Sequence, residues 1–412
     1  MAEAARARAR VFGAALALGG PWGETDAGEA QDALSLYVHV PYCARRCAFC
    51  DLSAGRPSGP EEPLAYLTAI RREIVRAVEE EPGLADRPAV SAYFGGGTPT
   101  AVQPEGLAGV LWLLRQQFQL PDGAEATVEA DPGTVSGESL WALRQAGFNR
   151  ISFGVQSLDD RILRRVGRMH DAARAEAAVA EASAEGFEQI SVDLILGLPQ
   201  VTPAVWRRTV EEVASWPVTH VSVYALQVEE GTAFGRRQRA GHLGLPPDDL
   251  VVEMGDEAET LLARAGFARY ELSSYARPGG RCLHNEGYWT GRAYRGLGAG
   301  AHSYIDGERL WNVRSPRRYI AAVVGGLSPV GGRERLAPDA ARAEAAALAL
   351  RRDRGIERQA FARAFGADPV EVFAPSLAPL ADAGLVEVSD ARVVLTARGR
   401  WLYNRVATAL LP

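Results

Sequence analysis

The amino-acid sequence predicts an α/β protein: a partial (β/α)6 TIM-like barrel followed by a C-terminal winged-helix-like α+β domain. Six strand-like runs, each followed by a helical pattern, occupy about 230 residues, which is the length that a parallel α/β barrel needs. Polar residues gather just after these runs, at the carboxyl ends where barrel enzymes place their chemistry. A change of composition near Ser315 predicts the second domain.

The expected strands are short and β-rich. The fifth run contains the segment VDLIL, which is nearly all apolar, as expected for a parallel strand that is buried on both faces. In the helix expected at Ser136–Ala146, Ser136 is a plausible N-cap and Gly147 a plausible C-terminal stop. The six strands are expected at Leu34–Val40, Val90–Phe94, Ala126–Ala130, Arg150–Gln156, Gln189–Leu196 and His220–Leu226.

Three segments of the chain are expected to differ in character. Residues 1–33 are expected to be a disordered extension, with a targeting peptide as the alternative. Residues 34–314 form the predicted barrel. Residues 315–412 contain an alanine-rich helix at Ala341–Arg352, two further helices and a hairpin at Gly384–Leu395, which together indicate a winged-helix-like domain. A DNA-binding role for this domain is disfavoured because it shows no basic stripe.

Composition excludes several classes of function. The 412 residues carry a formal net charge of -6, so no nucleic-acid partner is expected. The chain contains no lysine, which excludes a Schiff-base or phosphate-loop lysine. No apolar run approaches the roughly 20 residues that span a bilayer, so no integral membrane segment is expected. Clustered cysteines indicate a reducing compartment, and the expected location is cytoplasmic.

The spacing C-x3-C-x2-C places Cys43, Cys47 and Cys50 on one loop directly after the first strand. Three thiolates can hold three irons of a [4Fe–4S] cubane and leave the fourth iron open for another ligand. Structural zinc prefers four ligands and paired C-x2-C spacing, so the cluster is favoured over zinc. His39 lies near enough in sequence to be a fourth ligand, but its place inside the strand favours a position against the barrel wall.

Further polar or glycine-rich positions follow the later strands. The run Gly95-Gly96-Gly97-Thr98 would let a backbone approach a ligand closely. Glu129 ends the third strand, where it could bind a cationic ligand or cap the next helix. Asp193 lies inside the fifth strand and is costly to bury unpaired. It is expected either to form a structural salt bridge with an arginine such as Arg168 or to face a polar site.

These motifs resemble those of the radical S-adenosylmethionine (SAM) superfamily. The resemblance implies that the cysteines hold a [4Fe–4S] cluster, that SAM binds its open iron, and that a flavodoxin or ferredoxin supplies electrons. It implies that Phe49 packs near the adenine and that the glycine run accepts the methionine amine. The SAM-binding residues are expected to be Tyr37, Phe49, Gly96, Gly97, Thr98, Glu129, Gln156, Arg168 and Asp193.

From about Leu34 onward, the chain resembles the HemN/HemW branch of that superfamily through GGGTPT, EADPGT, NRISFGVQSLDDRILRRVGRMH and DLILGLP. One alternative is an oxygen-independent coproporphyrinogen III dehydrogenase of porphyrin biosynthesis, and enzymatic activity is therefore left open. That enzyme type usually has an additional cysteine where this chain has Leu52. The favoured alternative is a heme chaperone that passes heme to apo-hemoproteins. A third is a transcriptional regulator that senses SAM or heme.

The chaperone interpretation depends on a segment of the form His-Asn-x-x-Tyr-Trp. His284 could be an axial heme ligand, Cys282 could supply a thiolate instead, and Tyr288 and Trp289 offer flat faces for the macrocycle. The structural alternative is that these residues brace an edge of the barrel.

Overall fold

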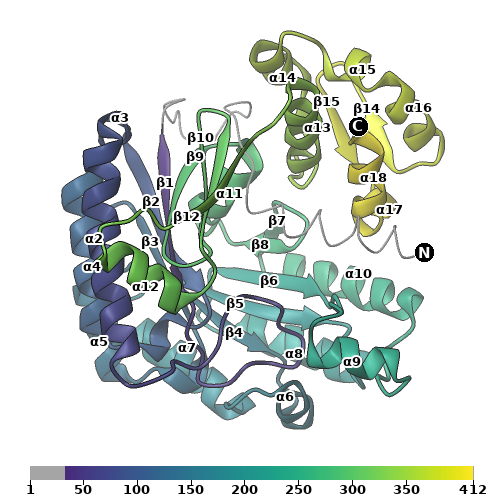
Figure 1. The fold of residues 1–412 in the computed structure, drawn as a ribbon. Coiled ribbons are helices and arrows are strands. Elements are labelled where there is room, and N and C mark those ends of the chain that lie inside the picture. Colours follow the sequence, from purple (N-terminus) through teal and green to yellow (C-terminus); the bar gives the residue numbers. More distant parts are fainter. Residues whose placement is uncertain (1–32, 412) are drawn as a thin grey trace.

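The structure is a computed structural model that describes residues 33–411 (Figure 1). The expected N-terminal extension therefore lies outside the described residues, apart from Ala33. No helix within the described part is long and apolar enough to cross a membrane.

Six parallel strands, each at the expected place, form the centre of a twelve-stranded sheet. Helices connect successive strands and lie outside the curved sheet (Figure 1). The strands are β1 (Leu34–Val40), β2 (Ala89–Gly96), β3 (Glu125–Ala130), β4 (Arg150–Gln156), β5 (Gln189–Leu196) and β6 (His220–Ala225). The connecting helices include α2 (Glu62–Glu80), α4 (Pro104–Phe118), α5 (Gly137–Gln145), α6 (Asp160–Val166), α7 (Ala172–Ala184), α8 (Pro203–Ser215), α9 (Ala233–Arg239) and α10 (Asp248–Arg264). As expected, Ser136 caps α5.

The barrel strands alternate between an apolar outer face and a polar inner face. In β1, Leu36 and Val38 are fully buried in the core beneath the helices. The intervening Ser35 instead accepts a hydrogen bond from Ser91 of β2 (3.1 Å between the hydroxyl oxygens). As expected, the VDLIL segment of β5 is buried except at Asp193, which is partly exposed. The interior of the barrel, which we call the lumen, is nevertheless lined by polar side chains as well. Polar side chains can line it because they bond to one another across neighbouring strands.

The sheet continues beyond the six expected strands on both sides. Strand β9 pairs in parallel with the free edge of β1, and β10, β11 and β12 follow in antiparallel order. On the other side β8 and β7 extend β6. The sheet order begins at β12 and ends at β7, so the described strands leave the barrel open, as expected for a partial barrel. The added strands are β7 (Ala268–Arg269), β8 (Ser274–Ala276), β9 (Ala293–Leu297), β10 (His302–Ile305), β11 (Glu308–Asn312) and β12 (Val330–Arg335).

The C-terminal domain has the expected winged-helix-like elements and its own hydrophobic core. Three strands in the order β13-β15-β14 pack with six helices. These elements are α13 (Pro338–Ala349), β13 (Ile356–Glu357), α14 (Arg358–Phe365), α15 (Pro369–Val372), α16 (Ala374–Asp382), β14 (Val386–Val388), β15 (Arg392–Leu395), α17 (Ala397–Trp401) and α18 (Tyr403–Leu410).

The domain begins later than the expected boundary at residue 315. Helix α12 (Pro316–Val324) contributes Tyr319 and Val323 to the core of the barrel. Strand β12 pairs with β11 in the large sheet. The second core starts only with α13, so the structural boundary lies between β12 and α13.

The C-terminal domain docks against α10 through a close aromatic contact. A Cβ atom placed on Gly255 would lie 2.2 Å from the Trp401 ring. The Trp401 indole N–H donates to Asp256 (3.0 Å), and Arg400 pairs with Glu259 (3.1 Å). Only glycine at position 255 lets the Trp401 ring come this close to the backbone of α10.

We predict that Gly255→Ala destabilises the protein by about 1–3 kcal/mol because the added methyl group displaces the Trp401 ring. Helix propensity alone would give the opposite sign, a gain of about 1 kcal/mol for alanine over glycine. The measurement is the free energy of unfolding from urea titration. Gly244→Ala, where an added Cβ meets nothing within 4 Å, is the control. A stabilised Gly255→Ala variant would contradict the docking described here.

Candidate functional site

The loop that carries the three cysteines leaves β1 and is held at several points. Within the loop, the Cys43 N–H donates to the Gly55 carbonyl (3.0 Å). The Ala48 N–H donates to Val166 at the end of α6 (2.9 Å), and the Ala48 carbonyl accepts from Phe234 of α9 (2.9 Å). Backbone hydrogen bonds to two helices thus fix the loop over the carboxyl ends of the strands.

The three cysteines are free thiols that are partly exposed. The Thr98 hydroxyl lies 3.6 Å from the Cys43 sulfur, and an Arg168 guanidinium nitrogen lies 3.4 Å from the Cys47 sulfur. Burial raises the pKa of the Cys43 thiol, and the Thr98 hydrogen bond opposes this increase. Burial also raises the pKa of the Cys50 thiol. Hydrogen-bond donors thus lie beside two of the three sulfurs, and the thiolate is the form of cysteine that binds iron.

The donor set of the loop fits an iron–sulfur cubane. Three partly exposed free cysteines lie on one loop, and cysteine thiolates are the usual ligands of such a cluster, each bound to a different iron. His39 does not join the cysteines, because its ring packs on Gly96 and bonds to the Tyr37 hydroxyl (3.0 Å).

The cysteine loop covers a cavity of about 310 Å³ at the carboxyl ends of the strands. All three cysteines line it, as does every residue expected to bind SAM except Tyr37. Tyr37 lies deeper in the lumen, stacked on Tyr93 with 6.3 Å between ring centres. The expected SAM residues in the lining are Phe49, Gly96, Gly97, Thr98, Glu129, Gln156, Arg168 and Asp193.

The glycine run lies where no side chain would fit. A Cβ atom on Gly97 would lie 2.6 Å from the Tyr42 carbonyl oxygen, and one on Gly96 would lie 2.3 Å from the His39 ring. Three consecutive backbone N–H groups that begin in this run have partners within the protein. Gly96 donates to Glu129 (3.1 Å), and Gly97 and Thr98 donate to the Val40 and Tyr42 carbonyls (2.8 and 2.7 Å). The run therefore fastens the start of the cysteine loop.

Glu129 lies half-buried between the glycine run and the lumen. One carboxylate oxygen accepts from the Tyr93 hydroxyl (2.7 Å) and the other from Gly96. Burial raises the pKa of Glu129 to about 7; the two hydrogen bonds oppose the shift, and the nearby Asp193 adds to it. A cationic ligand beside Glu129 would favour the ionised carboxylate and therefore lower this raised pKa.

Arg168 pairs with a residue that the sequence analysis did not select. Its guanidinium lies 2.7 Å from the Asp131 carboxylate and also donates to the Gly154 carbonyl. The alternative in which Arg168 pairs with Asp193 is wrong, because Asp193 accepts from the Ser152 hydroxyl (3.1 Å). Asp131 also accepts from the Gly133 N–H and from His170. Its place in the quoted EADPGT segment, two residues after Glu129, could have signalled this role.

Gln156 shows why sequence alone does not fix the site geometry. Its backbone φ is +70°, in the left-handed region, and the pairing of β4 with β5 shifts register beside it. Such local strain in a non-glycine residue is common at ligand sites. Tyr224 and Met169 also line the cavity, and no motif in the sequence identified them.

The His-Asn-x-x-Tyr-Trp segment lies at the opposite, amino-terminal end of the lumen, in α11 (Leu283–Thr290). Figure 1 shows α11 near the C-terminal domain, whereas α6, which holds the cysteine loop, lies at the other end of the barrel. The Glu125 carboxylate at the start of β3 accepts from the Leu283 and His284 N–H groups (2.9 Å each). The segment therefore closes the end of the lumen that faces away from the cysteines.

His284 is completely buried, and both of its ring nitrogens have partners. Nδ1 lies 2.9 Å from the Ser91 hydroxyl, and Nε2 lies 3.0 Å from the Tyr288 hydroxyl. Burial lowers the pKa of His284 to about 3, so the imidazole is neutral at physiological pH. Burial raises the pKa of the Cys282 thiol, whose sulfur lies 3.5 Å from Glu125. Trp289 reaches the C-terminal domain, where Arg351 lies 4.2 Å above its ring.

A second cavity, of about 490 Å³, lies between the barrel and the C-terminal domain; we call it the interface cavity. It extends from the cysteine loop to Arg351 and Trp401. Arg269, Arg351 and Arg400 also line it, each paired with an acidic side chain. Its apolar and aromatic lining comprises Phe49, Leu52, Leu196, Val223, Tyr224, Tyr275, Trp401 and Tyr403.

Comparisons with known proteins match both domains. Residues 37–213 match the Radical SAM superfamily, and residues 336–402 match the HemN C-terminal domain. The chain is 40% identical over 379 residues to the heme chaperone HemW of Mycobacterium tuberculosis (strain ATCC 25618 / H37Rv), covering 91% of this chain and 94% of that protein. This chain belongs to the HemW family of radical SAM proteins.

Two further relatives agree with this assignment. The heme chaperone HemW of Bacillus subtilis (strain 168) is 33% identical over 381 residues, which cover 92% of this chain and 99% of that protein. The solved structure of coproporphyrinogen III oxidase (HemN) from Escherichia coli superimposes with a TM-score of 0.80 at 27% identity, covering 92% of this chain and 90% of that chain. Membership of the family accounts for the [4Fe–4S] and SAM motifs around the 310 Å³ cavity.

We predict that Gly97→Ala costs about 1–3 kcal/mol of stability and lowers iron retention, because the methyl group would meet the Tyr42 and Val40 carbonyls at the start of the cysteine loop. The measurements are urea unfolding of the metal-free chain and iron per chain after anaerobic reconstitution. Gly123→Ala, where an added Cβ meets nothing within 4 Å, should leave both unchanged. Normal iron content in Gly97→Ala would show that the run does not position the cysteines.

Proposed function

We propose that this chain is a cytoplasmic radical SAM heme chaperone that binds heme and transfers it to apo-hemoproteins. The observation that carries the proposal is the 310 Å³ cavity, which brings the three cysteines together with the residues expected to bind SAM. Relatives covering almost the whole chain carry the name heme chaperone HemW.

Different residues of the 310 Å³ cavity would bind the [4Fe–4S] cluster and SAM. Cys43, Cys47 and Cys50 hold the cluster, which when bound supplies one-electron chemistry and an open iron for SAM. Arg168, held by Asp131, fixes positive charge beside Cys47. Glu129 offers negative charge to the cationic end of SAM. Phe49 lines the cavity from the cysteine loop. When SAM is bound, the Phe49 ring would pack against the adenine and restrict water.

Heme occupies the interface cavity in this proposal. Its volume lies within the range of about 300–1,000 Å³ that is usual for small-molecule sites. Aromatic side chains such as Tyr275 and Trp401 supply flat apolar faces for a macrocycle, and arginines supply partners for propionates. The interface cavity shares Phe49, Leu52 and Tyr224 with the 310 Å³ cavity that is expected to hold SAM, which we call the SAM cavity. Heme in the interface cavity would therefore lie beside the cluster site.

The segment that contains His284 contacts a residue in the wall of the interface cavity. Trp289 stacks on Arg351, and Arg351 lines the interface cavity and pairs with Glu271 (3.3 Å). Direct ligation of iron by His284 would require the Tyr288 or Ser91 hydroxyl to leave its ring nitrogen. We therefore assign His284, Cys282, Tyr288 and Trp289 a bracing role rather than contact with the iron.

We predict that Ala225→Trp, which fills part of the interface cavity, weakens heme binding at least about tenfold, whereas His284→Ala leaves the position of the Soret band unchanged. The measurement is anaerobic titration with heme, followed by the Soret absorbance. Ala321→Trp, on the exposed face of α12, is the control for the bulk of the added ring. Retained binding in Ala225→Trp together with an altered Soret band in His284→Ala would place heme at His284 instead.

We predict that the apparent affinity for SAM rises with pH between about 5.5 and 7. The Glu129 carboxyl, with a pKa of about 7, is mostly protonated at the lower pH, and only its carboxylate attracts the sulfonium. The affinity should change by up to roughly tenfold per pH unit below this pKa. Equilibrium dialysis measures it, and S-adenosylhomocysteine, which lacks the sulfonium charge, should show a smaller slope. Glu129→Gln should bind SAM more weakly and without this slope; an unchanged slope would remove Glu129 from the interaction.

The fold likeness to coproporphyrinogen III oxidase (HemN) supports a second candidate function, oxidative decarboxylation of coproporphyrinogen III. Leu52 stands against it, because that position usually carries the additional cysteine of the oxidase. Formation of protoporphyrinogen IX with consumption of SAM in an anaerobic assay would favour this second function over the chaperone.

A further inference from the structure

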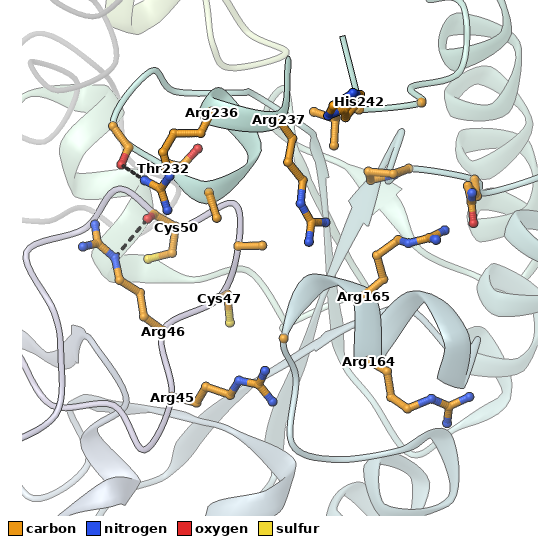
Figure 2. Close-up of a pocket in the computed structure, with 18 residues that line it drawn as sticks. Arg45, Arg46, Cys47, Cys50, Arg164, Arg165, Thr232, Arg236, Arg237 and His242 are labelled. Atoms are coloured by element: carbon orange, nitrogen blue, oxygen red, sulfur yellow. Dashed lines mark hydrogen bonds between the residues drawn. The ribbon is translucent and has the colours of Figure 1, made fainter. Parts of the chain in front are cut away.

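A strongly basic groove lies on the outer side of the cysteine loop (Figure 2). It encloses about 750 Å³ and is built from the loop, α6 and α9. Each of these elements contributes two exposed arginines to it, and His242 adds a further basic side chain. The arginines are Arg45, Arg46, Arg164, Arg165, Arg236 and Arg237.

The charge of the groove is not balanced locally. No Asp or Glu is among its lining residues in the described part of the chain. Arg46 donates to the backbone carbonyls of Cys50 and Leu52, and Arg236 donates to that of Gly231. The whole chain carries a formal net charge of -6, so this concentration of positive charge is a local feature. Such a groove attracts an anionic partner and raises its rate of association.

The cysteine loop borders both the groove and the SAM cavity. Arg45, Arg46, Cys47 and Cys50 line both spaces, and Figure 2 shows them from the groove. A partner seated in the groove would therefore approach the cluster at Cys47 and Cys50. Because electron transfer becomes much slower with distance, this side offers a short route to the cluster.

Building on the proposed cluster-binding function, we propose that the basic groove docks a small acidic one-electron-transfer protein that reduces the cluster. One electron passes from the partner's reduced low-potential centre, which is oxidised by one electron, to the cluster, which is reduced by one. No bond or proton needs to move. Weak, electrostatically steered interfaces of small area are typical of such redox partners.

Other anionic partners fit the groove less well. Single-stranded nucleic acid is bound through aromatic stacking platforms, and none of the described residues that line this groove is Phe, Tyr or Trp. A membrane surface requires basic residues on a projecting face with apolar side chains beside them, whereas these arginines surround a recess. Neither partner would explain why two cysteines lie in the wall of the groove.

The test uses the full chain and reduced plant-type [2Fe–2S] ferredoxin as the probe. Two charge-reversal variants alter the groove: Arg164→Glu with Arg165→Glu, and Arg236→Glu with Arg237→Glu. The matched control reverses the exposed Arg72 of α2 and Arg318 of α12, which do not line the groove. One measurement is the dissociation constant of oxidised ferredoxin with the metal-free chain. The other is the bimolecular rate of reduction of the reconstituted cluster.

At low ionic strength we expect each groove variant to raise the dissociation constant and lower the reduction rate by at least about tenfold. The control should change them less than about twofold, and added salt should reduce the differences. Equal values for groove and control variants would overturn the docking proposal. Dithionite should reduce the cluster in every variant. A wild-type chain that forms no cluster would overturn the proposed function, while ferredoxin binding to the metal-free chain would still decide the groove.

Discussion

Two backbone hydrogen bonds fix the start of the cysteine loop, on which the rest of the site depends. The N–H groups of Gly97 and Thr98 donate to the carbonyls of Val40 and Tyr42, and no side chain fits between these strands. The same contact places Gly96 against Glu129. The loop thereby borders both the cavity expected to hold SAM and the basic groove.

The two ends of the lumen differ in the side chains that surround them. At the carboxyl ends of the strands, charged side chains such as Glu129, Arg168 and Asp131 lie beside the cysteine loop. At the amino ends, Glu125 accepts two backbone hydrogen bonds from α11 and both ring nitrogens of His284 have hydroxyl partners. This network covers the amino-terminal end of the lumen. Buried polar groups with all partners satisfied make an element rigid. Through Trp289 and Arg351, this rigid end also supports the C-terminal domain and thus the interface cavity.

The sequence predicted the six central strands, the cysteine loop and most of the polar residues that the structure brings together around the 310 Å³ cavity, because each depends on local patterns: β-rich runs, cysteine spacing and polar residues after a strand. It did not predict pairings between distant residues, such as Arg168 with Asp131, because several acidic residues were equally plausible partners. His284 was expected to face a heme on chemical grounds, yet burial and its two hydroxyl partners depend on the packing of α11. The alternation of apolar and polar residues in LSLYVHV indicates that one face of this strand is polar. The VDLIL segment contains a single polar residue, Asp193, and does not show this alternation.

The most direct test is the iron and sulfide content of the anaerobically purified chain, together with its Mössbauer spectrum with and without SAM. The account predicts four irons and four sulfides per chain and one iron whose signal changes when SAM binds. Replacement of Cys47 by serine should abolish the cluster while the chain remains folded. Stoichiometric zinc in place of iron, or four irons that are all insensitive to SAM, would contradict it.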